Sequence, residues 1–308
     1  MEQPAPLRAG LIYGVIAYGL WGLLPLYFLL LAPTGPFEIV AWRIIWSLGF
    51  CVIALSITRG WGQLFAIVRR PRIMLTMAGA GVLIFINWQT YVLATTSGEV
   101  VQAALGYFIN PIVTVFLGVL VLREHLRRLQ WVAVGVSVVA VIVLAFAYGS
   151  FPWISLTLAF SFGLYGFVKK RVGGVVDALS GLTIESAWLV PVAVVELIVV
   201  GVTSGVTFGH VSVVNTVLLI AAGIVTAVPL LLFAASARRL PLVYLGLVQY
   251  VTPIMQFVVG VAFEHETMDA ARWAGFIVIW CALILLTVDL VRAARARNEL
   301  EAASVTIQ

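Results

Sequence analysis

The chain has 308 residues, of which 63% are hydrophobic and 10% are charged, whereas a soluble domain carries about 25% charged residues. This composition predicts an all-α integral membrane protein surrounded by lipid, with no separate soluble domain. The net charge of +5 comes from Lys and Arg in short clusters between apolar segments. Such clusters encode membrane topology, so we expect no nucleic-acid partner.

Apolar segments of about 20 residues, the length that crosses a bilayer, predict ten transmembrane helices. They span residues 10–31, 38–57, 73–94, 100–122, 130–147, 151–168, 180–200, 214–235, 241–263 and 272–290. The longer connection at residues 58–72 places apolar residues between cations, which predicts a short amphipathic helix at the membrane surface. We interpret that helix as an anchor in preference to a regulator.

Cations gather in alternate connections between these segments. The clusters are Arg59, Arg69, Arg70 and Arg72, then Arg123, Arg127 and Arg128, then Lys169, Lys170 and Arg171, then Arg238 and Arg239, and finally Arg292, Arg295 and Arg297. Positively charged loops stay in the cytoplasm. We therefore predict a multi-pass membrane protein with both termini in the cytoplasm and a cytoplasmic tail at residues 292–308.

Four residues of the fourth segment recur in the ninth at a constant spacing of 142 positions, the difference between 253 and 111. Pro111, Gly118, Glu124 and Trp131 return as Pro253, Gly260, Glu266 and Trp273. The match predicts two five-helix repeats, residues 1–147 and residues 148–291. Because five is odd, the second repeat enters the membrane inverted. This architecture recurs in secondary transporters, whose substrate sites lie near the midplane between the halves.

Pro111 and Pro253 are predicted to break their helices, since proline removes a backbone donor and frees the carbonyl four residues earlier. Those carbonyls belong to residues that are equivalent in the repeat and lie near mid-membrane. Together with nearby polar side chains they form our candidate floor of a central cavity. Its residues are Tyr107, Asn110, Gln249 and Gln256. The alternative is that the prolines and nearby glycines only kink and pack the helices.

Ionisable residues inside membrane spans are costly and point to function by default. Arg43 and Glu185 lie in corresponding helices of the two halves with opposite charges, so they either pair directly or flank a common cavity. An unpaired Arg43 suits an anionic substrate, and a Glu185 that takes up a proton suits coupling to the proton gradient. The alternative is that Arg43 binds Glu38 or nearby carbonyls and only holds the bundle together. Glu196, near a helix end, receives no role.

Three pairs of residues share a helix face at spacings of three or four. They are Tyr18 with Trp21, Asn87 with Tyr91, and Phe162 with Tyr165. These faces suit a pocket for a planar, partly apolar molecule, although most aromatic residues in spans pack or face lipid. The sequence shows no metal-ligand spacing, phosphate-binding glycine loop or serine-nucleophile motif. We therefore predict no metal, no cofactor and no enzymatic activity.

Several motifs, read in order, resemble one family of transporters over nearly the whole chain. They are AYGLWGLLPLYF (17–28), EIVAWRIIWS (38–47), NWQTYV (87–92), LGYFINP (105–111), SFGLYGFVKK (161–170), GLTIE (181–185) and LGLVQYVTP (245–253). The chain resembles the RarD type of the EamA branch of the drug/metabolite transporter superfamily. This resemblance implies ten helices in an inverted repeat and a plasma-membrane carrier. One departure is Ala104, where we expect Ser.

The resemblance also assigns interest to the residues at the family's motif positions. These are Tyr18, Trp21, Arg43, Asn87, Trp88, Asn110, Tyr165, Glu185 and Gln249. Our expectation is a secondary transporter that exports small metabolites, amino acids or amphiphilic drugs by alternating access. The alternative is a non-transporting membrane protein, either an intramembrane enzyme or a scaffold. The substrate and coupling ion stay open, and the fifth and tenth segments are compatible with a homodimer.

Overall fold

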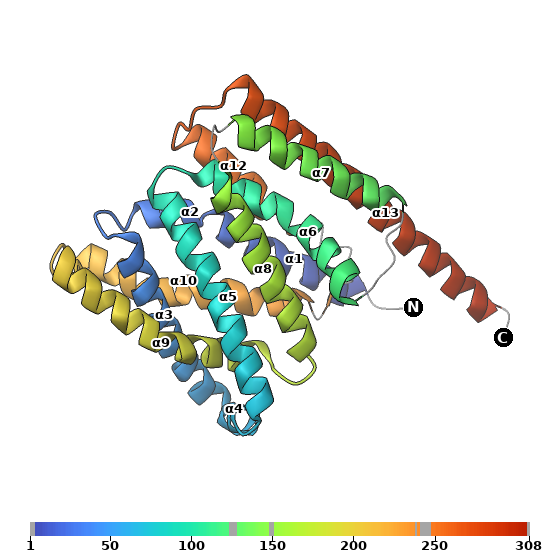
Figure 1. The fold of residues 1–308 in the computed structure, drawn as a ribbon. Helices are drawn as coiled ribbons and strands as arrows, with labels where there is room; N and C mark the ends of the chain where they lie inside the picture. The colour runs from blue at the N-terminus through green and yellow to red at the C-terminus, as the bar shows by residue number, and fades with distance from the viewer. Residues whose placement is uncertain (1–3, 123–127, 148–150, 238, 241–247, 307–308) are drawn as a thin grey trace.

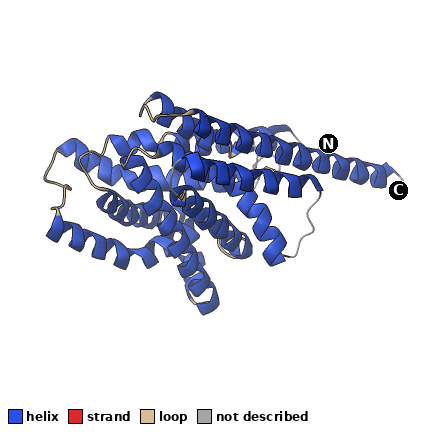
Figure 2. Cartoon of the chain, turned by 45° about the horizontal axis from the view of Figure 1, so that its top comes forward, coloured by secondary structure: helices blue, strands red, loops and turns tan. Residues whose placement is uncertain are grey.

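The computed structural model describes residues 4–122, 128–147, 151–237, 239–240 and 248–306. It describes some of these by their backbone alone: residues 4–7, 111, 114–122, 130, 133, 137, 141, 144–147, 170, 234, 237, 286, 290 and 293–306. Every regular element in this part of the chain is an α-helix (Figure 1 and Figure 2). Among the described residues, six helices are long and apolar enough to cross a membrane. The chain is therefore an all-α, multi-pass membrane protein.

The helices follow the predicted apolar segments closely. In chain order they are α1 (Pro4–Gly22), α2 (Leu24–Leu29), α3 (Pro36–Thr58), α4 (Trp61–Val68), α5 (Pro71–Thr96), α6 (Val100–Leu122), α7 (Arg128–Ala147), α8 (Trp153–Val172), α9 (Ala178–Thr203), α10 (Val213–Ala237), α12 (Val251–Ala262) and α13 (Ala270–Thr306). The predicted surface helix corresponds to α4. The start of the predicted ninth segment, residues 241–247, lies outside the described residues.

The first and last predicted segments differ in detail from the helices of the structure. The first segment is divided at Leu23 into α1 and α2, with Pro25 at the start of α2, where a missing N–H costs no helical hydrogen bond. The cytoplasmic location of the predicted tail at residues 292–308 stays a prediction, and α13 continues through most of this tail, to Thr306. Its residues 291–303 are mostly Ala, Arg, Glu and Leu, which are strong helix formers, so the helix extends past the apolar span.

The α7 and α13 helices lie side by side along one edge of the bundle (Figure 1). An aromatic cluster attaches this pair to α6 and α12. The Phe276 ring of α13 lies 4.8 Å from Phe257 of α12 and 6.3 Å from Phe108 of α6, measured between centroids. The pair is therefore peripheral, as expected for the fifth and tenth segments. The remaining helices surround the centre of the bundle.

Close helix contacts depend on glycine at two crossings. A Cβ at Gly223 of α10 would lie 2.3 Å from the Trp46 carbonyl oxygen of α3, and a Cβ at Gly106 of α6 would lie 2.8 Å from the Ser155 carbonyl oxygen of α8. No side chain fits at these distances. Small residues let membrane helices approach at backbone distance, where dispersion contacts stabilise the packing.

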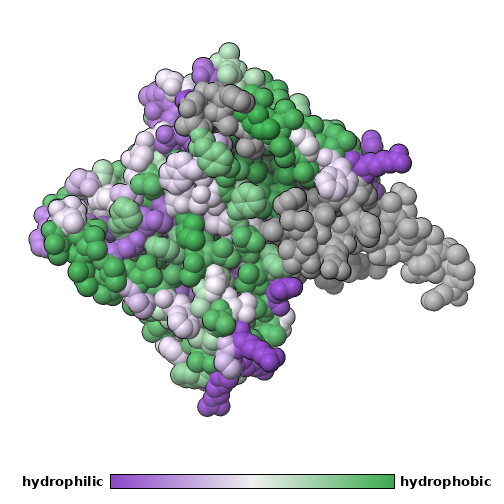
Figure 3. All heavy atoms as spheres, viewed as in Figure 1, coloured by the Kyte–Doolittle hydropathy of each residue, from purple (hydrophilic) through white to green (hydrophobic). Residues whose placement is uncertain are grey.

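The bundle has two ends with different chemistry. One end, which we call the Glu38 end, is formed by residues 30–35, 97–99, 204–212 and 263–269. The other, the α4 end, carries the basic residues around α4 and the α8–α9 connection. Apolar side chains cover most of the visible face between them, while hydrophilic side chains gather around α4 (Figure 3). This division matches a protein that meets water at its ends and lipid along its sides.

Candidate functional site

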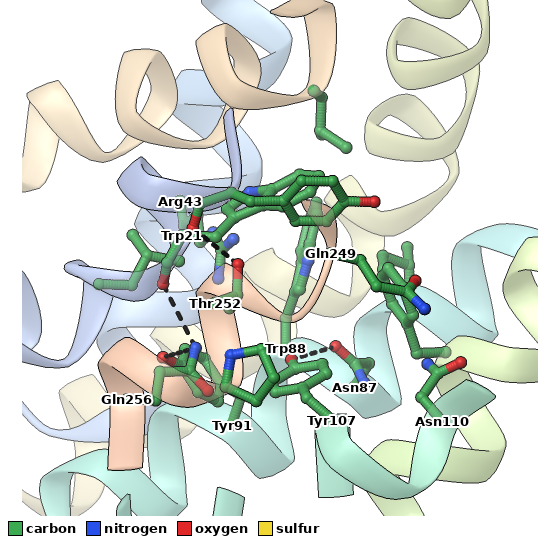
Figure 4. Close-up of a pocket in the computed structure, with 16 residues that line it drawn as sticks. Trp21, Arg43, Asn87, Trp88, Tyr91, Tyr107, Asn110, Gln249, Thr252 and Gln256 are labelled. Carbon is green, nitrogen blue, oxygen red and sulfur yellow. Dashed lines mark hydrogen bonds between the residues drawn. The ribbon is translucent and has the colours of Figure 1, made fainter. Parts of the chain in front are cut away.

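A cavity of about 710 Å³, including its open mouth, lies at the centre of the bundle (Figure 4). The described lining residues are Tyr18, Trp21, Leu24, Arg43, Ile84, Asn87, Trp88, Tyr91, Tyr107, Asn110, Phe162, Leu230, Gln249, Thr252, Pro253 and Gln256. They come from both predicted halves of the chain.

All the predicted substrate-binding residues except Tyr165 line this cavity. Sequence reasoning did not assign Thr252 or Leu230 to the site. A signal for Thr252 was present, because it lies 142 positions after Asn110 and is therefore its counterpart in the repeat. Leu230 is one apolar residue within an apolar helix, and no pattern in the sequence distinguishes it.

Arg43 of α3 is buried at the cavity wall, with 4% of its surface exposed. Its Nε donates a hydrogen bond to Thr226 Oγ1 at 2.6 Å, and its guanidinium carbon lies 4.4 Å from the Trp88 ring centroid. Its Nη1 is buried and has no hydrogen-bond partner among the described residues. One donor of the guanidinium is thus left for a ligand.

Glu38 does not bind Arg43, which answers one alternative left open by the sequence. Its carboxylate accepts hydrogen bonds from the backbone N–H groups of Thr207 and Phe208, at 2.9 and 3.0 Å. The Trp42 indole also donates to it at 3.2 Å and stacks on the Phe208 ring at 4.1 Å. Glu38 therefore ties the start of α3 to the loop between α9 and α10.

Glu185 does not pair with Arg43 and does not line the cavity. Its carboxylate accepts hydrogen bonds from Lys169 Nζ at 2.9 Å and Tyr165 Oη at 3.1 Å, both from α8. Tyr165 is therefore turned toward Glu185, although its ring lies 6.1 Å from that of the cavity residue Phe162. The two buried charges predicted to act together occupy separate sites.

Hydrogen bonds fix the amide side chains of the cavity wall. Asn87 of α5 donates from Nδ2 to the Leu158 carbonyl at 3.2 Å and to Ser161 Oγ at 3.1 Å, and its Oδ1 accepts from Tyr107 Oη at 3.0 Å. This amide connects α5, α6 and α8. A buried amide with all three contacts satisfied holds one orientation, so it gives the wall a defined shape.

Gln256 of α12 makes the corresponding links on the other side of the cavity. Its Nε2 donates to Tyr91 Oη at 2.8 Å and to the Trp21 carbonyl at 3.3 Å, and Thr252 Oγ1 donates to the Tyr18 carbonyl at 2.6 Å. These bonds tie α12 to α1 and α5 (Figure 4). The cavity wall therefore depends on polar contacts between the predicted halves.

The two predicted helix breaks differ in the structure. The second occurs just before Pro253, because α12 begins at Val251 after two non-helical residues, Gln249 and Tyr250. Pro253 is thus the third residue of α12, where its missing N–H costs nothing. The first is wrong for the backbone, since α6 runs without interruption through Pro111. A proline removes a single helical hydrogen bond, and packed neighbours allow the helix to continue.

The described residues contain no group of three or more His, Cys, Asp or Glu side chains placed to hold a metal ion. The free Cys51 is buried and Cys281 is exposed.

Comparisons with known proteins identify a matching family and several similar proteins. The model of the EamA-like transporter family matches residues 8–146. The chain is 48% identical to "Protein RarD" of Streptomyces exfoliatus, over 100% of this chain and 97% of that protein. It is 42% identical to "Uncharacterized transporter YojE" of Bacillus subtilis (strain 168), over 96% and 98%. A solved structure described as "Crystal structure of protein" matches with a TM-score of 0.60 at 16% identity, over 92% and 98%, and shows the fold alone.

The chain belongs to the RarD-type transporters of the EamA family. It is accordingly a membrane transporter of the drug/metabolite transporter superfamily, and the names of its relatives indicate transporters rather than enzymes. In this RarD-type protein the central cavity, which is lined by both predicted halves, is the candidate site for the transported solute.

Proposed function

We propose that the protein is a secondary active transporter that exports small metabolites or amphiphilic drugs across the plasma membrane by alternating access. The observation that carries this proposal is that repeat-equivalent residues line one cavity. Tyr107 and Gln249 are related by the spacing of 142 positions, as are Asn110 and Thr252, and all four lie on its wall. Inverted-repeat transporters bind substrate at such an interface.

Helix packing supports two repeats, residues 1–147 and 148–291. In this scheme α1 corresponds to α8, α3 to α9, α5 to α10, α6 to α12 and α7 to α13. Exchanging counterparts converts the α6–α8 contact into α12–α1, the α1–α10 contact into α8–α5, and the α3–α10 contact into α9–α5. All six of these pairs are in contact. The pairs α3–α9, α6–α12 and α7–α13 map onto themselves and are also in contact. Two halves of similar shape can exchange conformations, which is the basis of alternating access.

The charge distribution supports an orientation with the α4 end and both termini in the cytoplasm. Arg59, Arg72, Lys169 and Arg239 lie toward that end, where positively charged loops are retained during insertion. The Glu38 end then faces outward. Glu124, the counterpart of Glu266 in this scheme, lies outside the described residues. A homodimer through α7 and α13 stays a prediction.

Contacts between the halves close the Glu38 end in this conformation. Glu38 of the first half binds the backbone of Thr207 and Phe208 in the second. Glu266 of the second half accepts a hydrogen bond from the Val101 N–H of the first, at 2.9 Å. Alternating access requires these contacts to open when the substrate leaves outward. In a protein that carries a cysteine at the cavity residue Leu230 (Leu230→Cys), Glu38→Ala is therefore expected to increase labelling of this cysteine by an impermeant thiol reagent added outside.

The direct test is transport by the purified protein in liposomes. We expect faster movement of at least one of chloramphenicol, L-phenylalanine and 3-phenylpropionate than in protein-free liposomes, under an imposed solute or proton gradient. Inside-out membrane vesicles that accumulate the same compound would support the export direction. Rates equal to those of protein-free liposomes for all three compounds, with folded protein, would contradict the proposal.

Proton coupling through Glu185 is a further part of the proposal. Its carboxylate is buried and bonded to Tyr165, whose ring contacts the cavity residue Phe162. Proton uptake must compete with Lys169, so coupling requires that ion pair to open during the cycle. We expect Glu185→Gln to lose transport driven by a proton gradient while solute exchange without a gradient continues. Equal dependence on the gradient in both proteins would exclude this role.

A further inference from the structure

We propose that the central cavity binds a singly charged aromatic carboxylate, with the carboxylate on Arg43 and the ring among the aromatic side chains. This inference rests on the proposed transport function, because it names the class of solute for the same cavity. It excludes zwitterionic amino acids and amines as preferred ligands.

The charge of the cavity carries the first step. Arg43 is the one ionised group among the described lining residues, and no Asp or Glu belongs to that set. Its described contacts are the Thr226 hydroxyl and the rings of Trp88 and Phe28, and its buried Nη1 lacks a hydrogen bond. A buried cation is costly without an anion, and a carboxylate accepts charge-assisted hydrogen bonds from guanidinium groups. The ligand would supply the counter-charge that no described lining residue provides.

Glu38 and Glu185, the two carboxylates that the sequence suggests as partners of Arg43, are bound elsewhere. Glu38 accepts the backbone N–H groups of Thr207 and Phe208, and Glu185 is paired with Lys169. Neither neutralises Arg43. The guanidinium therefore keeps its positive charge available at the cavity wall, rather than within an internal ion pair.

The shape of the wall carries the second step. Aromatic rings surround the space next to Arg43, and they meet edge to face: Tyr18 with Trp21 at 5.3 Å, and Tyr91 with Tyr107 at 5.7 Å. Figure 4 shows Trp21 and Arg43 on one side of this space and Tyr91 and Tyr107 on the other. Aromatic faces and edges favour a planar ring over a flexible polar chain. The organic part of the ligand is thus aromatic.

The absence of an acidic group among the described lining residues sets the selectivity. An ammonium group entering the cavity loses its hydration and meets amide oxygens, but no carboxylate, and it is repelled by Arg43. The carboxylate of a zwitterion can bind Arg43, but its ammonium group still loses its hydration and is repelled by Arg43. The expected order of affinity is therefore carboxylate, then zwitterion or neutral analogue, then amine.

Four compounds with the same phenylpropyl skeleton test this order: 3-phenylpropionate, L-phenylalanine, 3-phenyl-1-propanol and 3-phenylpropylamine. Binding to the full-length protein in detergent is measured by calorimetry and by the shift in unfolding temperature. We expect 3-phenylpropionate to bind at least about tenfold more tightly than the other three, since one charge-assisted interaction is worth about that factor.

Variants assign the preference to Arg43. Arg43→Gln should reduce the affinity for 3-phenylpropionate to about that of the alcohol, while the alcohol itself binds as before. Arg239→Gln removes an exposed cation that contacts Tyr13, away from the cavity, and should keep the preference. If Arg43→Gln does not fold, Thr226→Val serves instead, because it removes the hydroxyl that orients Nε. It should weaken carboxylate binding several-fold without affecting the alcohol.

Equal or tighter binding of L-phenylalanine or the amine would overturn the proposed class, as would retention of the carboxylate preference in the Arg43 and Thr226 variants. Failure of all four compounds to bind folded protein would also overturn it. These outcomes are distinct from failure of the proposed function, because transport of chloramphenicol or another non-carboxylate in liposomes would leave that function standing.

Discussion

Arg43 and Glu185 look alike in the sequence, as single opposite charges inside corresponding helices of two repeats, yet the structure gives them different surroundings. The Glu185 carboxylate is paired with Lys169 and accepts a hydrogen bond from Tyr165, and both partners lie on α8. Arg43 lines a cavity, and among the described residues its side chain has one hydrogen bond, to Thr226. The comparison shows that a buried charged residue indicates a ligand site only when no oppositely charged residue of the protein pairs with it.

The largest expected effect on stability concerns the ion pair between Glu185 and Lys169. Glu185→Gln should lower the free energy of unfolding by about 2 kcal/mol, because it leaves the Lys169 ammonium without its counter-charge. This value is smaller than for a fully buried pair, since Lys169 is partly exposed. Glu196→Gln, on the same helix and without a described hydrogen bond at Oε2, should change it by less than about 0.5 kcal/mol. Chemical unfolding in detergent measures both. Equal losses would remove the distinction between a paired and an unpaired carboxylate.

The next effect separates two tyrosines that the sequence placed in one site. Tyr165→Phe removes a hydrogen bond to a buried carboxylate and should cost about 1.5 kcal/mol of stability without changing the affinity for 3-phenylpropionate. Tyr107→Phe removes the bond to Asn87 on the cavity wall and should change that affinity. The measurements are unfolding and calorimetric binding. An altered affinity in Tyr165→Phe with no change in Tyr107→Phe would reverse our assignment.

A smaller effect concerns Glu266, a loop carboxylate without a cation partner among the described residues. Burial raises the pKa of its carboxyl to about 7, and the neighbouring Glu264 and Glu99 add to this rise, while the backbone N–H of Val101 opposes it. The folded protein then binds more protons than the unfolded chain between about pH 4.5 and 7, so stability falls as pH rises through this window.

Glu266→Gln should remove about 1 kcal/mol of that fall, after allowance for solvent screening. Gln keeps an acceptor for the Val101 N–H, and Glu266→Ala, which does not, separates the hydrogen bond from the charge. Unfolding temperatures from pH 5 to pH 8 provide the readout. An unchanged pH dependence in the Gln variant would show that Glu266 does not titrate in this range.

The smallest expected effect returns to Arg43. Arg43→Gln should change the free energy of unfolding by about 0.5 kcal/mol or less, since the lost contacts with Thr226 and Trp88 are offset by relief of an unneutralised buried charge. Its effect on carboxylate binding is expected to be large. A loss of stability as great as that of Glu185→Gln would mean that Arg43 only stabilises the helix bundle, which is the alternative stated in the sequence analysis.

The sequence predicted the elements well, because membrane helices need long apolar segments that leave a clear pattern. It also predicted much of the cavity wall, since polar residues such as Asn87 and Gln256 are conspicuous in apolar surroundings. It predicted a helix break at both prolines, whereas α6 continues through Pro111 and only the second break is present, at Gln249 and Tyr250 before α12. Both prolines have the same local chemistry, and only packing decides whether a helix continues.

The partner of Glu185 was also beyond the sequence analysis. Lys169 was counted as a cation of a cytoplasmic connection, but α8 continues to Val172 and keeps it on the helix. Tyr165 and Lys169 lie four residues apart, so they share one face and reach the same carboxylate. That spacing was visible, whereas the approach of α9 to this face follows from tertiary packing.

The central claim is that the transported solute occupies the cavity between the two halves. The most direct measurement is counterflow of labelled 3-phenylpropionate in liposomes containing Leu230→Trp, which fills the cavity, or Ile224→Trp, an exposed position on the same helix. Our account predicts that Ile224→Trp exchanges solute like the wild type and that Leu230→Trp, folded to the same extent, exchanges little. Wild-type exchange in Leu230→Trp would contradict it.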